Sequence, residues 1–300
     1  MNILVVGAGA IGSLFGALLS HHHQVTLLGR TPHVKAIQKH KLSITGTTKL
    51  TVSISAVDTI TDLKSPDVLL LCVKSYDTQA ALQQVQPLCS TKTTLCTLQN
   101  GLSHIDIIKK FVAPESIIVG CTTHGAIFSQ PGHIIHTAKG HTLLGALNGS
   151  ESTRLTQLVT IFAKAGIATT LSHTILEELW KKAIVNSSIN PLTALFQCKN
   201  GYLLTNPILQ EMVRLICHES TNIAQASGYS FTSKETLQKT KEVIATTKEN
   251  YSSMLQSVQQ HKKTEIGAIN GVLAHIAHSK GVDAPLNNLL VTIITGLEQF

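Results

Sequence analysis

Hydrophobic residues in the first half of the chain form short, continuous runs that alternate with amphipathic segments. The continuous runs predict strands at residues 2–7, 24–28, 66–73, 93–99 and 116–122. Helices are predicted between most of these strands, at residues 10–21, 31–39, 76–86 and 103–111. Strands that are apolar along their whole length and alternate with helices are typical of a parallel sheet covered on both faces. The pattern therefore predicts an α/β domain with a doubly wound sheet.

Shorter apolar stretches predict additional strands beside the main sheet. Residues 42–56 predict a small hairpin, and residues 133–136 with 142–145 predict a second such pair. A helix at 151–164 and a short strand at 167–171 are expected to close the domain.

From Ile175 onward every strong hydrophobic period is helical. Pro191 is expected to force a bend at Asn190, because proline lacks the N–H group and crowds the preceding turn. The pattern predicts an all-helical C-terminal domain, so that residues 1–170 form the first domain and residues 171–300 the second. Its helices are predicted at residues 175–189, 207–227, 233–258, 264–279 and 286–298.

The composition supports two medium-sized domains and indicates where in the cell the protein is expected. Of the 300 residues, 43% are hydrophobic and 14% are charged, as expected for a globular protein with a large interior. We expect neither a membrane-spanning segment nor a cleavable signal, and therefore a cytoplasmic protein. The six cysteines are scattered and form no C-x-x-C pair, which indicates reduced core residues rather than a disulfide framework or a metal site.

The formal net charge of +7 is compatible with a nucleic-acid binder, but there is no dense Lys/Arg stripe and only 4% of residues are aromatic. A field that attracts anionic small molecules explains the charge equally well, so no nucleic-acid or membrane partner is expected. The run His21–His23 follows the first helix. Favourable contacts with the helix dipole explain it, and zinc binding is the alternative.

Gly7, Gly9 and Gly12 follow the first strand directly and precede an apolar helical pattern. In a strand-turn-helix unit, the first glycine permits the turn, the second lets the backbone approach a pyrophosphate, and the third lets helix and strand pack closely. The N-terminus of the helix then faces the anion. The arrangement predicts a dinucleotide site.

The second strand ends at Gly29-Arg30, about twenty residues beyond the glycines, where an NAD site carries a carboxylate for the ribose. No Asp or Glu is near. Because an arginine fork holds a 2′-phosphate and a carboxylate repels it, NADPH is the predicted cofactor. A solvated arginine after a strand is the alternative.

Later strands end in polar residues at Lys74, Asn100 and His124. Ligands of doubly wound sheets bind outside the carboxyl ends of the strands, so these residues predict a polar crevice there. Each also has an ordinary interpretation, as a surface lysine, a turn dipeptide with Gly101, or a capping histidine.

In the helical half, Lys182, Asn186 and Asn190 recur at i, i+4 and i+8, which places them on one helix face. Asparagine is a poor helix former, so this stripe suggests a role other than helix stability. The alternative is a solvated face, since Glu177–Lys181 and Glu178–Lys182 are i, i+4 pairs in the favourable order.

Three further polar residues lie in later helical runs. Ser252 and Ser253 fall within the predicted helix 233–258, and Glu265 opens the next one on an apolar face. A carboxylate on such a face requires a partner, for which a lysine is suitable. Alternatively, Thr264 caps this helix and Glu265 interacts with its dipole.

Taken together, these segments resemble the ketopantoate reductases (2-dehydropantoate 2-reductases) of pantothenate and coenzyme A biosynthesis. The resemblance extends nearly from end to end. Its motifs are Val-Gly-Ala-Gly-Ala-Ile-Gly, Val-Lys-Ser, Gln-Asn-Gly-Leu, Gly-Cys-Thr-Thr-His-Gly, Glu-Leu-Trp-Lys-Lys-Ala-Ile-Val-Asn-Ser-Ser-Ile-Asn-Pro-Leu-Thr-Ala, Asn-Tyr-Ser-Ser-Met-Leu-Gln and Thr-Glu-Ile-Gly-Ala-Ile-Asn-Gly.

The resemblance implies a Rossmann-type domain followed by a helical domain, with the active site between them. It implies NADPH-dependent reduction of ketopantoate with Lys182 as general acid and Glu265 acting with it. Another small 2-keto or 3-hydroxy acid is the alternative substrate, and a non-catalytic NADP-sensing protein is a further alternative. A monomer or a homodimer is expected. The implied substrate-binding residues are Asn100, Lys182, Asn186, Asn190 and Ser253, and the implied cofactor-binding residues are Gly7, Ala8, Gly9, Ala10, Ile11, Gly12, Arg30, Lys74 and Asn100.

Overall fold

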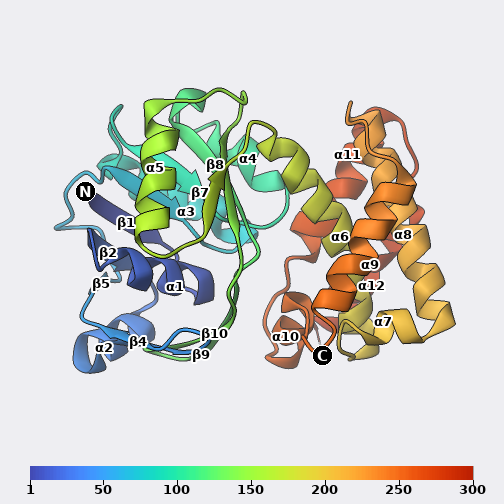
Figure 1. Ribbon diagram of the computed structural model, residues 1–300, viewed down its shortest axis with the longest axis horizontal. Coiled ribbons are helices and arrows are strands. Elements are labelled where there is room, and N and C mark those ends of the chain that lie inside the picture. Colours follow the sequence, from blue (N-terminus) through green and yellow to red (C-terminus); the bar gives the residue numbers. More distant parts are fainter. Residues whose placement is uncertain (300) are drawn as a thin grey trace. The chain divides into compact units, whose positions relative to one another are not determined.

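A computed structural model describes residues 1–299 of the chain, which separate into two compact units (Figure 1). The first, called the sheet unit, contains Met1–Gln99 and His104–Leu176. The second, called the helical unit, contains Asn100–Ser103 and the chain from Glu177 onward. The short segment Asn100–Ser103 therefore packs with the helices, although it follows a strand of the sheet.

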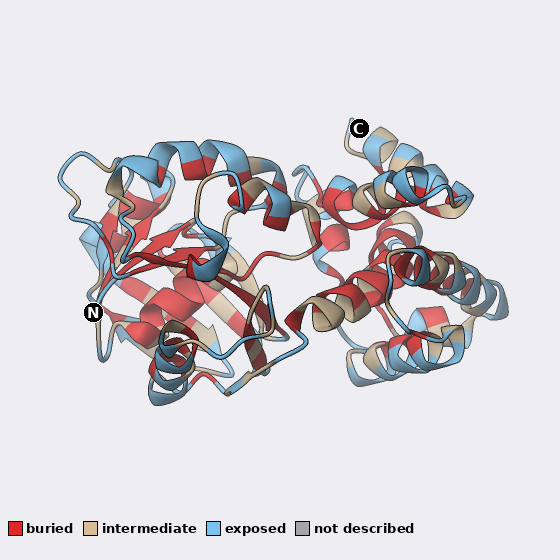
Figure 2. Ribbon diagram, turned by 90° about the horizontal axis from the view of Figure 1, so that it is seen from above, coloured by how far each residue is buried: buried red, intermediate tan, exposed pale blue. Residues whose placement is uncertain are grey.

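The sheet unit is built on an eight-stranded sheet whose central strands are buried along their whole length (Figure 2). In spatial order its strands are β12 (Thr169–Leu171), β11 (Thr142–Ala146), β8 (Ile117–Thr122), β7 (Thr94–Thr97), β6 (Val68–Leu71), β1 (Asn2–Val6), β2 (Gln24–Leu28) and β5 (Ser55–Val57).

The six strands from β5 to β8 are parallel and follow the order of a doubly wound dinucleotide fold, in which the order reverses between β1 and β6. β11 pairs antiparallel with β8, and β12 pairs parallel with β11, so these last two strands run opposite to the other six. The predicted class, an α/β Rossmann-type sheet followed by an all-helical part, is confirmed. The reversal point lies where ligands of such sheets bind.

The strand pairs predicted at 42–56 and 133–145 are partly wrong. β3 (Leu42–Gly46) and β4 (Leu50–Val52) do form a hairpin, but the next strand, β5, joins the main sheet beside β2. β10 (His133–Ala138) pairs with β9 (Gly125–Gln130) instead of β11. Together β4, β3, β10 and β9 form a separate four-stranded sheet. The turn at Pro131-Gly132, where Gly132 has φ +76°, explains the β9–β10 hairpin.

Helix α1 packs against β1 and β2 on one side and against the four-stranded sheet on the other. Phe15 of α1 is fully buried, and its ring lies 5.7 Å from that of Phe162. Apolar side chains from both sheets thus share one core with α1. The helices of this unit are α1 (Ala10–Leu19), α2 (Thr31–His40), α3 (Thr78–Val85), α4 (Ser103–Ile108) and α5 (Thr153–Lys164), with short 3-10 turns at Ser75–Asp77, Gln86–Leu88 and Pro114–Ser116.

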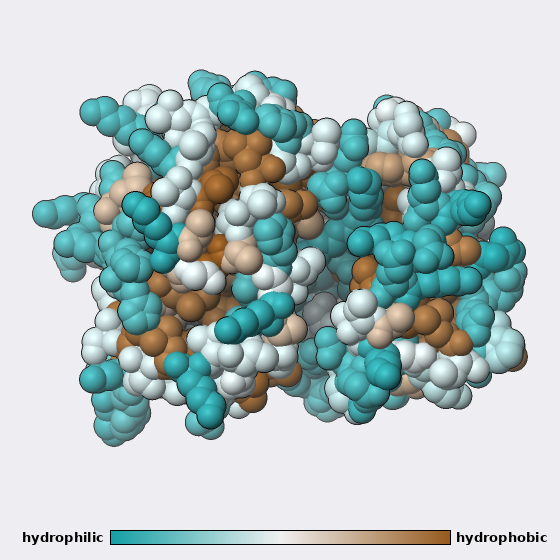
Figure 3. Space-filling model, in the orientation of Figure 1, coloured by the Kyte–Doolittle hydropathy of each residue, from teal (hydrophilic) through white to brown (hydrophobic). Residues whose placement is uncertain are grey.

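The helical unit departs from prediction in three places. The first helix continues through Pro191, the run 233–258 is two helices with a break before Ser252, and the run 264–279 begins with a π-helical turn. Over α9 the exposed surface is largely hydrophilic (Figure 3). Its helices are α6 (Ile175–Phe196), α7 (Tyr202–Thr205), α8 (Pro207–Ala226), α9 (Ser233–Thr246), α10 (Ser253–Gln259), the π turn η4 (Gly267–Gly271), α11 (Val272–Lys280) and α12 (Pro285–Leu297).

The break before α10 has a local cause. Ser252 is the N-cap of α10, and its side chain accepts a hydrogen bond from the Leu255 N–H at 3.1 Å. Residues 233–258 contain no glycine or proline, so nothing in the sequence signals a break and the pattern predicts one helix there. In the part of the chain described, residues 1–299, no helix combines the length and apolar character needed to cross a membrane.

Three histidines in the sheet unit are held in their neutral form. The His33 Nδ1 accepts the Gly132 N–H at 2.9 Å, and its Nε2 lies 3.0 Å from the Ser13 hydroxyl. Burial lowers the pKa of His33 to about 4. His124 stacks on His136, with 3.1 Å between His124 Nδ1 and His136 Nε2, and burial lowers the pKa of His124 to about 4 as well. His124 is half-buried, lies two residues after the end of β8, and contacts β10 through His136.

These histidines predict a loss of stability in mild acid. In the unfolded chain the His33 imidazole has its ordinary pKa of 6.5, whereas in the folded protein its pKa is about 4. The contribution of neutral His33 to the free energy of unfolding is therefore complete above pH 6.5 and declines as the pH falls below it. His33→Asn keeps an acceptor for Gly132 but does not titrate. Between pH 7.5 and pH 5 the wild type should lose about 2 kcal/mol more unfolding free energy than this variant.

Urea unfolding at the two pH values measures this difference. The matched control is His40→Asn, because His40 is exposed on the same helix, and it should behave as the wild type does. Equal pH dependence of His33→Asn and the wild type would show that His33 is not kept neutral by the fold.

Candidate active site

The three glycines of the first turn have different surroundings. Gly7 has φ +97°, and a Cβ there would lie 2.6 Å from the Val73 nitrogen. A Cβ at Gly12 would overlap the carbonyl oxygen of Gly7. Gly9 faces open space, with nothing within 4 Å of the position of a Cβ. Gly7 and Gly12 therefore allow close backbone packing, whereas Gly9 leaves room for a ligand.

The N-terminus of α1 is open to an anion. Gly9 is its N-cap, no side chain caps the helix, and the first turn has no acidic residue. The first N–H groups of a helix have no partner within it and carry the positive end of its dipole. Ala8, Ala10 and Ile11 complete this loop with small or apolar side chains. The loop therefore fits the pyrophosphate of a dinucleotide.

Arg30 and Lys74 follow the two strands that flank β1. Arg30 is exposed and is the N-cap of α2, directly after Gly29, where a Cβ would lie 2.7 Å from the Cβ of Ala8. The chain before Arg30 thus packs on the glycine loop. Lys74 is also exposed and is the N-cap of the turn Ser75–Asp77, after β6. Both cations belong to the carboxyl ends of strands beside β1.

Gln99 holds the loop that carries Lys74, and inspection of the sequence did not select it. Its side chain is 5% exposed, and its Nε2 donates to the Val73 carbonyl oxygen at 3.0 Å and to the Thr78 hydroxyl at 2.7 Å. Gln99 therefore connects the end of β7 to both ends of the loop that carries Lys74. The signal in the sequence is a glutamine that ends an apolar strand immediately before Asn-Gly.

In the helical unit, Lys182, Asn186 and Asn190 lie within the continuous helix α6 and so share one face. Lys182 and Asn186 are half-buried, and Asn190 is 7% exposed. The neighbouring Lys181 pairs with Glu178 at 2.9 Å and lies 5.8 Å from the centre of the Phe231 ring. The i, i+4 spacing had predicted Glu177 as the partner of Lys181.

Three other segments with predicted site residues are joined to α6 or to one another. The Thr193 hydroxyl donates to the Ser252 hydroxyl at 2.7 Å, which fixes the start of α10 beside α6. The adjacent Ser253 is exposed. Gly101, with φ +82°, packs so closely on the Ala268 carbonyl that a Cβ would clash there. Ala268 belongs to η4, so Asn100 directly precedes a residue that packs on η4.

Glu265 is 7% exposed and immediately precedes Ile266, the residue that leads into η4. Its carbonyl oxygen accepts the N–H groups of Ala268 and Ile269 at 3.0 and 3.1 Å. The capping interpretation of Thr264 also has support, because its hydroxyl accepts the Ile266 N–H at 3.2 Å. Thr264 and Glu265 are thus both buried where the chain enters η4.

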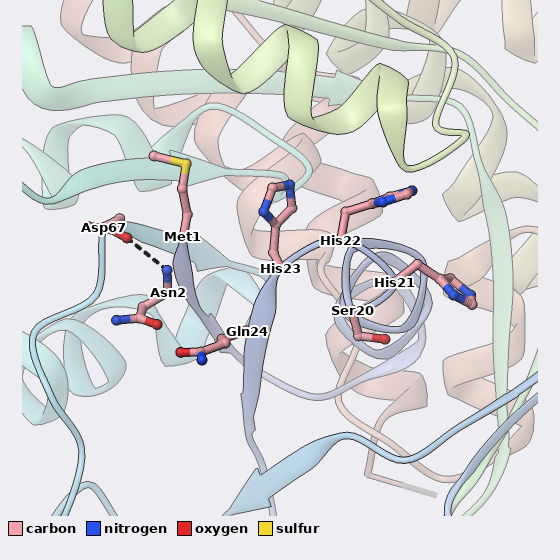
Figure 4. A pocket seen from close by; sticks show the side chains of 8 residues that line it. All are labelled: Met1, Asn2, Ser20, His21, His22, His23, Gln24 and Asp67. Carbon is pink, nitrogen blue, oxygen red and sulfur yellow. Dashed lines mark hydrogen bonds between the residues drawn. The ribbon is translucent and has the colours of Figure 1, made fainter.

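A separate hollow lies at the opposite, amino ends of β1 and β2 (Figure 4). None of the predicted site residues lines it. The Asn2 N–H donates to the Asp67 carboxylate at 2.8 Å, and Figure 4 shows the three imidazole rings spread apart rather than converging. Across residues 1–299, no group of three or more His, Cys, Asp or Glu side chains could hold a metal ion. The hollow is lined by Met1, Asn2, Ser20, His21, His22, His23, Gln24 and Asp67.

Solved structures include close matches to this fold. The ketopantoate reductase of the PanE/ApbA family from Ralstonia eutropha has a TM-score of 0.92 and 26% identity, with 100% of this chain and 99% of that chain covered. D-mandelate dehydrogenase in complex with NADH has a TM-score of 0.92 and 27% identity, over the same shares of the two chains.

Sequence comparison identifies the family. The model of ketopantoate reductase PanE/ApbA matches residues 3–149, and the model of its C-terminal part matches residues 174–298. The 2-dehydropantoate 2-reductase of Pyrococcus abyssi is 37% identical over 299 residues, which cover 99% of this chain and 98% of that protein. The chain therefore belongs to the ketopantoate reductase PanE/ApbA family.

Proposed function

We propose that this protein reduces 2-dehydropantoate (ketopantoate) to pantoate with NADPH, as a step in pantothenate and coenzyme A biosynthesis. The observation that carries the proposal is the polar face of α6, with Lys182, Asn186 and Asn190, in a chain that is 37% identical to a 2-dehydropantoate 2-reductase. An NADP-sensing protein without activity has no need of this face. The predicted division into a cofactor-binding part, residues 1–170, and a substrate-binding part, residues 171–300, belongs to the proposal.

The glycine loop and the two exposed cations would hold the cofactor. NADPH supplies the hydride when it is bound. The open N-terminus of α1, from Gly9 to Gly12, would accept the pyrophosphate, and Ala8 and Gly7 shape the turn. Arg30 would hold the 2′-phosphate with its planar fork. Lys74 and Asn100 would contact the remainder of the cofactor, with Gln99 fixing the loop of Lys74.

Lys182 would act as the general acid. When a hydride is added to the carbonyl carbon of a 2-keto acid, negative charge develops on the carbonyl oxygen. A positioned ammonium group stabilises that charge most where it appears, and the Lys182 Nζ then donates the proton that completes the hydroxyl. Glu265, buried two residues before η4, would act with Lys182.

Neutral donors would hold the substrate. Asn186 and Asn190 on α6, Ser253 at the start of α10, and Asn100 can orient a carboxylate and a hydroxyl through hydrogen bonds. Because these groups carry no charge, they do not form an ion pair with Lys182. They leave the ammonium available for the carbonyl oxygen.

A cytoplasmic location is part of this proposal. It is supported by the six cysteines, each of which is a free thiol in the structure, the usual state in a reducing compartment. For the assembly we propose a monomer or a homodimer acting on a small molecule without a nucleic-acid partner.

Replacing Lys182 by alanine tests the general acid. Lys182→Ala should fold and bind NADPH, but kcat should fall by about 10²- to 10⁴-fold, the usual contribution of a positioned acid. NADPH oxidation with ketopantoate measures the rate. Lys181→Ala is the matched control, because Lys181 is adjacent and already paired with Glu178, and it should remain active. Near-normal turnover of Lys182→Ala would overturn the assignment, and faster turnover of shorter 2-keto acids would overturn the substrate.

Arg30→Ala tests the choice of cofactor. Loss of the guanidinium should raise KM for NADPH by about tenfold or more and leave KM for NADH nearly unchanged, because only NADPH carries the 2′-phosphate. Lys35→Ala, an exposed cation on the same helix α2, controls for the loss of one positive charge. An equal effect of Arg30→Ala on both cofactors would contradict a contact with the 2′-phosphate.

A further inference from the structure

Pro191 leaves a gap in the hydrogen bonding of α6. In an α-helix the carbonyl of residue 187 accepts the N–H of residue 191, and proline has no N–H. The ring of proline also crowds that carbonyl, which kinks or ends most helices. Nevertheless α6 continues from Ile175 to Phe196. The gap joins residues 187 and 191, each of which directly follows an asparagine of the polar face assigned to the substrate.

Asn270 fills this gap from another segment. It is completely buried, and its Nδ2 donates to the Ser187 carbonyl oxygen at 3.1 Å. The same amide nitrogen donates to the Asn287 Oδ1 at 2.9 Å. A donor at this distance supplies the hydrogen bond that Pro191 cannot make. The helix therefore continues beyond Pro191 with its Ser187 carbonyl satisfied.

Asn270 is itself held in place by a buried network. The Asn287 Nδ2 donates to the Glu219 carboxylate at 2.8 Å, and that carboxylate also accepts the backbone N–H groups of Leu286 and Asn287 at the start of α12. Ser187 and Ser220 are 2.9 Å apart through their hydroxyl oxygens. Such a network fixes the amide nitrogen of Asn270 toward α6.

The location of Asn270 connects several parts of the site. It lies inside the π turn η4, which begins two residues after Glu265 and contains Ala268, on whose carbonyl Gly101 packs. π turns are uncommon and occur frequently at functional sites. One residue thus joins the turn beside Glu265 and the segment of Asn100 to the proline gap in α6.

We propose that Asn270 is a positioning residue of the reductase, which sets how α6 presents Lys182, Asn186 and Asn190 by replacing the missing hydrogen-bond donor of Pro191. This inference rests on the proposed function. Asn270 acts through α6 and η4 and not through contact with substrate. Without its amide the Ser187 carbonyl is buried and unpaired, so the helix is expected to deform at the gap.

A cycle of variants separates this role from simple packing. Asn270→Ala should lower kcat/KM for ketopantoate on the order of tenfold or more, with KM for NADPH unchanged. Pro191→Ala restores a backbone N–H that can reach the Ser187 carbonyl. In the double variant the donor of Asn270 is no longer needed there, so kcat/KM should return to within about threefold of Pro191→Ala alone. A cavity left by the lost side chain would not be corrected in this way.

Asn206→Ala controls for loss of stability alone. Asn206 is the N-cap of α8 and belongs to the same unit, and it accepts the N–H groups of Ile208 and Leu209. This variant should unfold at lower urea concentration and keep both kcat and KM.

Hydrogen exchange of the backbone amides in residues 186–193 gives a readout that needs no turnover. Exchange should be faster in Asn270→Ala and return to the wild-type rate in the double variant. A wild type that does not reduce ketopantoate would overturn the proposed function alone. Unchanged exchange in Asn270→Ala, or a loss of kcat/KM that Pro191→Ala does not correct, would overturn the positioning role.

Discussion

The close approach of backbone at Gly7 is the constraint on which the sheet unit depends. A side chain at Gly7 would collide with Cys72 and Val73, directly after β6, and one at Gly12 would collide with Gly7 itself. Only glycine lets β1, β6 and α1 meet this closely. The same contact leaves the N-terminus of α1 uncovered at the point where the strand order reverses, so the packing requirement and the anion site have one origin.

In the helical unit the corresponding constraint is a missing donor. Pro191 removes one hydrogen bond from α6 in the turn that carries Asn186 and Asn190. A buried asparagine from η4 replaces it, and the π turn that carries this asparagine also packs on Gly101. The π turn η4 therefore links the polar face of α6, through Asn270, to the Asn-Gly segment, through Gly101, and it begins two residues after the buried Glu265.

The chemistry follows from what each unit contributes. The sheet unit provides an open helix terminus and two exposed cations, a set suited to phosphate groups. The helical unit provides one ammonium beside neutral amide and hydroxyl donors, a set suited to a 2-keto acid on whose oxygen charge develops. D-mandelate dehydrogenase shares the fold at a TM-score of 0.92, so the fold alone does not select the acid that is reduced.

The sequence by itself determined those features that depend on neighbours along the chain. Periodicity and turn chemistry are local, so the sequence predicted the buried strands and the glycine turn. It also showed the spacing of Lys182, Asn186 and Asn190 and the family motifs. Only the tertiary structure decided which short strands pair, as β10 with β9, and how α6 passes Pro191. Those outcomes depend on partners distant in the sequence, such as Asn270 for Ser187, 83 residues away, and local patterns carry no information about such partners.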